Sequence, residues 1–146
     1  MKRFTTIVLL LFCLGPVLAA DRSLKPKPIS PEKQQWISPP AVPGLRATWM
    51  LGSEKGAGLY LLRVKLARGT HVPLHTHPDE RNTTVLSGTL YVGFGKSFAE
   101  DKMVAVPAGS VFVAPANVEH YLWAKDGEVI YQESGVGPTA TNIFKP

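Results

Sequence analysis

The stretch "GTHVPLHTHPDERNTTVLSG", residues 69–88, carries two histidines one residue apart between two glycines. If this segment is extended, His75 and His77 leave the same face of the strand, because side chains alternate between the two faces. Their imidazoles then lie close enough to share one ion, and imidazole is a common ligand of divalent transition metals. The stretch therefore predicts a strand that carries part of a metal site.

The same stretch resembles the first sequence motif of the cupin superfamily. That motif has a glycine, five residues, His-x-His, three or four residues, a glutamate, six residues and a glycine. The chain matches it at Gly69, His75, His77 and Gly88. The glutamate position is occupied by Arg81. A guanidinium cannot ligate a metal, because it offers only hydrogen-bond donors and stays protonated.

A later segment, "GSVFVAPANVEHYLWA" (residues 109–124), resembles the second cupin motif. That motif has a glycine, five residues, Pro-x-Gly, two residues, a histidine, three residues and an asparagine. The matching residues are Gly109, Pro115 and His120. Asn117 stands at the second glycine, where asparagine is compatible because it tolerates left-handed backbone angles, and Ala124 stands at the asparagine. With both half-motifs in this order, the chain is identified as a member of the cupin superfamily over residues 36–146.

The resemblance implies an all-β fold, a single cupin β-barrel (double-stranded β-helix or jelly roll) over residues 45–146 with the site inside. The residue pattern agrees, because short apolar runs are broken by Gly, Pro and Asp at intervals of about ten residues. A tight turn is expected at Ser87 and Gly88. The segments expected to contain strands are residues 58–69, 83–95, 103–107, 110–115, 119–125 and 128–134.

The resemblance further implies a divalent transition metal (Fe, Mn, Ni, Cu or Zn) held by His75, His77 and His120. Three outcomes are open for the missing carboxylate. Glu80 takes its place if Pro78 kinks the strand, although strict alternation turns Glu80 the other way. Alternatively, water or substrate completes a three-histidine site. In the third outcome no metal is tightly held, and Arg81 with the histidines forms an anion-binding ligand pocket. Asp79 shares strand parity with Arg81, so these two are also candidates for an ion pair.

The first 19 residues have the pattern of a secretory signal peptide. Lys2 and Arg3 precede an apolar run over residues 7–14, and small residues follow, so cleavage is expected near Ala19. The only cysteine, Cys13, lies in that run, so the mature chain depends on packing rather than disulfides. We expect a periplasmic or secreted protein without a membrane span, because no later stretch reaches the roughly 20 apolar residues that a span requires.

Residues 20–44 form a proline-rich leader that we expect to be extended, since proline fixes backbone angles and lacks an amide donor. Trp36 and Ile37 are the exception, and we expect them to dock on the body of the domain. The chain carries a net charge of +5 without a Lys/Arg stripe, so nucleic acid is not an expected partner.

The sequence thus predicts an exported cupin that binds a divalent metal and a small organic molecule, with a dioxygenase-type activity as the first interpretation. The alternative is a non-catalytic cupin that binds a metal or a small anion, in which Arg81 contacts the ligand. Whether the protein is an enzyme stays open. A homodimer formed through an edge strand is expected only by analogy with other cupins.

Overall fold

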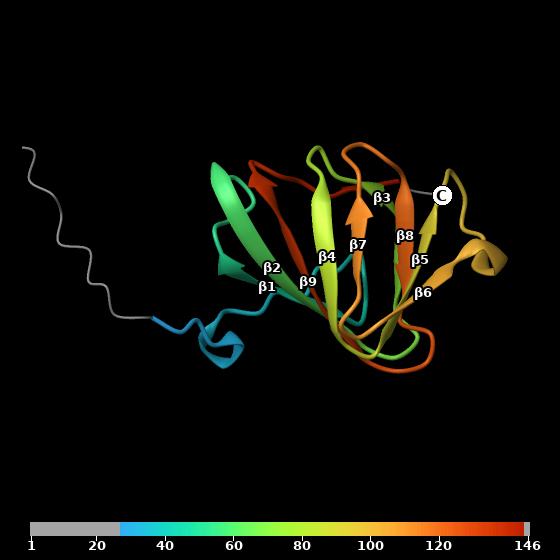
Figure 1. Ribbon diagram of the computed structural model, residues 1–146, viewed down its shortest axis with the longest axis horizontal. Helices are drawn as coiled ribbons and strands as arrows, with labels where there is room; N and C mark the ends of the chain where they lie inside the picture. The colour runs from blue at the N-terminus through green and yellow to red at the C-terminus, as the bar shows by residue number, and fades with distance from the viewer. Residues whose placement is uncertain (1–26, 145–146) are drawn as a thin grey trace, which may run out of the picture.

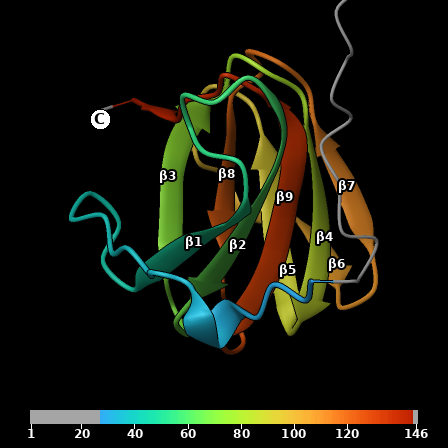
Figure 2. The same cartoon turned by 90° about the vertical axis from the view of Figure 1, so that its left-hand side faces the viewer.

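The computed structural model describes residues 27–144. The predicted signal peptide over residues 1–19 lies outside the described residues, as does the start of the leader. Two five-stranded antiparallel sheets face one another and curve into a flattened barrel (Figures 1 and 2). Within residues 27–144, no helix is long and apolar enough to cross a membrane. The predicted all-β fold is confirmed.

The two sheets interleave strands from both halves of the chain. The first sheet has the order β1 (Leu45–Leu51), β2 (Gly58–Leu66), β9 (Val129–Gly137), β4 (Arg81–Ser87) and β7 (Val111–Ala114). The second has the order β10 (Asn142–Ile143), β3 (His71–Thr76), β8 (His120–Trp123), β5 (Thr89–Phe94) and β6 (Val104–Pro107). Single 3-10 turns occur at η1 (Pro31–Lys33) and η2 (Glu100–Lys102). Every segment expected to contain a strand does so.

The two turn predictions made from individual residues are confirmed. Gly88 connects β4 to β5 with a φ of +78°, and a Cβ there would lie 2.4 Å from the carbonyl oxygen of Glu128. Only glycine fits this position without strain. Asn117 has a φ of +60°, the left-handed conformation expected where the cupin motif has glycine. Its amide donates to the carbonyl of His77 at 2.7 Å, which ties the two motif segments together.

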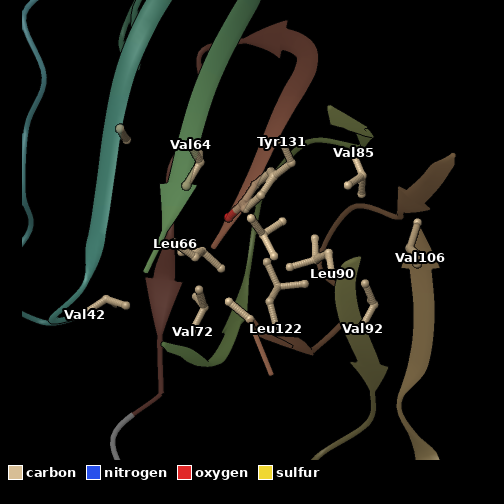
Figure 3. Close-up of a cluster of buried hydrophobic side chains, with 13 residues drawn as sticks. Val42, Val64, Leu66, Val72, Val85, Leu90, Val92, Val106, Leu122 and Tyr131 are labelled. Carbon is tan, nitrogen blue, oxygen red and sulfur yellow. The ribbon is translucent and has the colours of Figure 1, made fainter. Parts of the chain in front are cut away.

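The hydrophobic core lies between the two sheets, and Figure 3 shows its side chains converging from strands of both. Leu66, Val85, Leu90 and Val129 are fully buried. On β9 the buried positions are Val129, Tyr131, Glu133 and Gly135, because alternate residues of a strand face the same side. The same alternation that builds the core thus carries a carboxylate into the barrel.

The proline-rich leader docks on the first sheet as expected for Trp36 and Ile37. Ile37 exchanges two backbone hydrogen bonds with Ala47 of β1, at 2.8 and 2.9 Å. The Trp36 ring lies under two cations, 5.5 Å from the Arg46 guanidinium carbon and 5.2 Å from the Lys65 ammonium. The Ile37–Ala47 bridge extends the sheet by a short paired segment at the β1 edge, and the cations over Trp36 hold the leader against the same strands.

Candidate metal centre

The structure brings together the three histidines that the motifs predict. His75 on β3 pairs directly with His120 on β8, and His77 follows β3 by one residue. Their ligand atoms all lie within 4.8 Å of one another. The ring centroids are 4.1 Å apart for His75 and His120, 4.9 Å for His75 and His77, and 5.1 Å for His77 and His120. All three side chains are buried.

Backbone carbonyls fix the tautomer of each ring. Nδ1 of His75 lies 2.7 Å from the carbonyl of Pro73, and Nδ1 of His120 lies 3.0 Å from that of Val118. Nδ1 of His77 lies 2.9 Å from the carbonyl of Ala140. A carbonyl oxygen only accepts, so each Nδ1 must carry the proton and each Nε2 must carry the lone pair. This is the arrangement that orients histidine as a metal ligand.

The three histidines are held in the neutral form that ligation needs. Burial lowers the pKa of His75 to about 3, with His120 adding to the effect. Burial together with the Arg81 charge lowers the pKa of His77 to about 2. Burial also lowers the pKa of His120. At neutral pH the cluster therefore presents lone pairs rather than positive charges.

The structure does not bring Glu80 to the histidines. Glu80 is exposed in the connection between His77 and the start of β4, whereas Arg81 is 3% exposed and faces the barrel interior. Asp79 Oδ1 lies 3.9 Å from Arg81 Nε, so the pair suggested by strand parity is present but long. The kink at Pro78 therefore does not carry a carboxylate to the position of the missing ligand.

Arg81 has a closer partner that the sequence reading missed. Its Nη1 donates to Glu133 Oε2 at 2.5 Å, and its Nη2 donates to Thr139 Oγ1 at 2.8 Å and to the Ala140 carbonyl at 3.2 Å. Glu133 lies on β9, next to β4 in the sheet. Burial raises the pKa of Glu133, although Arg81 opposes that rise. The signal for Glu133 was its parity with Val129 and Tyr131, which predicts an inward side chain.

Arg81 also supports the metal centre indirectly. The Ala140 carbonyl accepts from both Arg81 Nη2 and His77 Nδ1. Thr139 Oγ1 in turn donates to Asp79 Oδ1 at 2.5 Å, and Tyr60 donates to Asp79 Oδ2 at 2.6 Å. The guanidinium therefore holds the segment that orients His77.

A cavity of about 290 Å³ opens beside the histidines. His75, His77, Arg81, Glu133 and Thr141 form its polar wall, and the exposed Glu54 also lines it. Its other lining residues are mainly apolar, including Ile37, Val42, Trp49, Leu62, Val64 and Ile143. Ile37 and Val42 come from the leader, which therefore contributes to the binding space. A concave, largely apolar space with a few convergent polar groups is the usual form of a small-molecule site.

The donor set fits a transition metal. His77 Nε2 is buried and has no hydrogen-bond partner within residues 27–144, which is costly for a lone pair unless a ligand meets it. Three neutral imidazoles with backbone-held Nδ1 atoms match the nitrogen ligands that zinc, iron, copper and nickel accept. The fourth ligand of the cupin motif is missing, because Arg81 stands in its place.

The family model described as "Cupin domain" matches residues 62–136, just over half of the chain. The chain belongs to the cupin family. Germin-like protein 8-11 of Oryza sativa subsp. japonica is 40% identical to this cupin over 72 residues, which cover 44% of this chain and 32% of the rice protein. The cupin spans less than half the length of the curated relatives that it matches.

Solved structures share the fold of this cupin at low identity. The polyketide cyclase RemF from Streptomyces resistomycificus has a TM-score of 0.64 and 14% identity, covering 84% of this chain and 88% of RemF. A variant of the salicylate 1,2-dioxygenase from Pseudoaminobacter salicylatoxidans, solved in complex with gentisate, has a TM-score of 0.58 and 17% identity. That match covers 71% of this chain and 30% of the dioxygenase.

Proposed function

We propose that this protein is an exported cupin that holds one divalent transition metal through His75, His77 and His120 and binds a small organic molecule in the adjoining cavity. The observation that carries the proposal is the convergence of three neutral imidazoles whose Nδ1 atoms are all engaged by carbonyls. Such a set has no evident structural use other than to present its Nε2 atoms to a shared partner.

Three protein ligands leave coordination positions open, so a bound metal would supply Lewis-acid or redox chemistry to a molecule in the cavity. The chain itself keeps the histidines neutral, orients His77 through the Ala140 carbonyl, and surrounds the cavity with apolar side chains that exclude water. A dioxygenase-type activity on a small organic molecule is the finer proposal, and the fold similarity to a salicylate dioxygenase is compatible with it.

The export part of the proposal rests on the basic and apolar pattern of residues 1–19. It is tested by N-terminal sequencing of the protein recovered from the periplasm or medium of an expressing bacterium. A mature chain beginning at Ala20 is expected. An N-terminus at Met1 in the cytoplasmic fraction would contradict it.

The metal part is tested by elemental analysis of protein purified without chelator, in the wild type and in variants carrying alanine at each histidine. We expect near-stoichiometric metal in the wild type and its loss in His75→Ala, His77→Ala and His120→Ala. Glu80→Ala serves as the matched control and should retain the metal, because Glu80 is exposed and outside the cluster. Wild-type protein that takes up none of the five candidate metals would refute the proposal.

The activity part is tested by oxygen consumption of the metal-loaded protein with a panel of phenols and diketones. Consumption that disappears in the metal-free histidine variants is expected. A metal-loaded protein that consumes no oxygen with any member of the panel would favour the non-catalytic alternative predicted from the sequence.

A further inference from the structure

The polar wall of the cavity differs from an ordinary anion site, because its one cation is already matched. Arg81 donates through Nη1 to Glu133 and through Nη2 to Thr139 and Ala140, and only its Nε lacks a hydrogen bond within the described chain. An anion that binds two guanidinium nitrogens would have to displace Glu133 from Nη1 or Thr139 and Ala140 from Nη2, because Nε is the one nitrogen of this side chain without a hydrogen bond in the described chain. Displacement of Glu133 would leave a buried carboxylate unpaired, which is unfavourable.

The charges of the lining residues also disfavour an anion in the cavity. Besides Arg81, the charged lining residues are Glu133 inside and Glu54, which is exposed. The Arg81 guanidinium is matched by the Glu133 carboxylate in a buried ion pair. In the metal-free protein this pair therefore offers no unmatched positive charge to a carboxylate.

Glu133 has acceptor capacity to spare. A carboxylate has about four acceptor positions, and within residues 27–144 the only side-chain hydrogen bond to Glu133 uses one of its oxygens. The residue lines the cavity beside His75 and His77 and is itself 5% exposed. A buried acceptor with unused lone pairs gains most from a ligand that brings a donor.

We infer that the cavity takes an uncharged molecule with an apolar or aromatic body and a hydroxyl group that donates to Glu133, with Arg81 acting as the positioning residue for that carboxylate. This inference rests on the proposed small-molecule function and names its ligand class. The cavity of about 290 Å³ is about twice the size of an apolar cavity that holds benzene, roughly 150 Å³, so a two-ring body fits.

Three matched probes test the inference by titration calorimetry on the mature chain, both after dialysis against chelator and after loading with zinc. The probes are 2-naphthol, which has a hydroxyl donor, 2-methoxynaphthalene, which lacks the donor, and 2-naphthoate, which is an anion. In the metal-free protein we expect 2-naphthol to bind about tenfold tighter than either of the others, in line with a hydrogen bond to a charged group. Wild-type protein that prefers 2-naphthoate, or ranks the naphthol and its methyl ether equally, would overturn the inference.

Glu133→Gln should change the affinities for two probes in opposite directions, which loss of structure would not do. The affinity for 2-naphthol should fall about tenfold. The affinity for 2-naphthoate should rise, because the Arg81 charge then has no carboxylate partner in Glu133. Ser134→Ala, on the opposite face of the same strand, should keep the wild-type ranking. Equal weakening of all three probes by Glu133→Gln would overturn the role given to Glu133.

If Glu133→Gln does not fold, the double variant Arg81→Gln/Glu133→Gln is used in its place. It replaces the buried ion pair with two neutral amides. This double variant should weaken 2-naphthol without gaining affinity for 2-naphthoate. An undiminished affinity for 2-naphthol would overturn the role of Glu133. The two proposals fail separately. A naphthol preference in a protein that takes up none of the five candidate metals leaves the inference and removes the metal function. Metal uptake with a naphthoate preference in the metal-free protein leaves the metal function and removes the inference.

Discussion

Replacing Arg81 with methionine tests the buried ion pair that stands where cupins carry a metal-binding glutamate. The Arg81 and Glu133 side chains are 3% and 7% exposed and lie 2.5 Å apart. Methionine fills much of the same space but leaves Glu133 buried without its cation. Removal of one partner from a buried pair costs about 3–5 kcal/mol. For a chain of this size, that loss lowers Tm by roughly 10–20 °C.

The assay is urea unfolding followed by tryptophan fluorescence and circular dichroism, in chelator so that metal binding adds no stability. The double variant Arg81→Met/Glu133→Leu should recover at least half of the loss, because two apolar groups replace two charges. Arg63→Met is the matched control. Arg63 bonds only to Gln132 among the described side chains, so its loss should cost less than about 1 kcal/mol.

Two results would contradict a stabilising role for the Arg81–Glu133 pair. A loss below about 1 kcal/mol in Arg81→Met would mean that the pair contributes little. A double variant as unstable as the single one would mean that the loss comes from the shape of the arginine or its bonds to Thr139 and Ala140, not from the unpaired Glu133 charge.

Three further predictions concern pH, the leader and a turn. The metal-free protein should lose stability as pH falls from about 6.5 towards 3, because the unfolded chain protonates its histidines near 6.5 whereas folded His75 does so only at about 3. In His75→Asn, the slope of the free energy of unfolding against pH, measured by urea unfolding, should be shallower by up to about 1.4 kcal/mol per pH unit. An unchanged slope would contradict the lowered pKa of His75. Ile37→Pro removes the amide that donates to β1, so we expect faster proteolysis of the leader and weaker ligand binding; wild-type rates would show that the leader is not held there. Gly88→Ala should cost about 2–4 kcal/mol by thermal unfolding because of its positive φ and the close carbonyl, whereas Gly127→Ala, whose Cβ meets nothing within 4 Å, should be nearly neutral; equal effects would refute the turn argument.

The sequence was sufficient for the features that depend on local spacing. His75 and His77 share a face because they are two residues apart, and the second motif placed His120 beside them. Asn117 and Gly88 were recognisable because only a few residue types tolerate left-handed backbone angles. These features depend on short segments of the chain, so they can be predicted without knowing which strands pair in the sheets.

The partner of Arg81 could not be read from the sequence, because it depends on which strands become neighbours. Arg81 on β4 meets Glu133 on β9 only because these strands pair in the sheet. Parity alone indicated that Glu133 points inward. The sequence suggested Asp79 instead, the nearer residue in the chain, and that contact is the longer of the two.

Whether the Glu80 side chain faces the histidines or solvent depends on the residue at which β4 begins. Residues 77–80 connect β3 to β4 with a bend at Pro78 and Asp79, and β4 starts at Arg81. Arg81 therefore takes the inward position and Glu80 stays in solvent. A shift of one residue in the start of the strand would have exchanged them, and a sequence pattern does not fix strand boundaries to one residue.

X-ray absorption spectroscopy of the zinc-loaded protein identifies the atoms that bind the metal. We expect imidazole scattering from three histidines with zinc–nitrogen distances of about 2.0–2.1 Å, the remaining position being filled by a light atom. We also expect His77→Ala to lose this spectrum. A spectrum without imidazole scattering, or one unchanged in His77→Ala, would contradict the three-histidine centre.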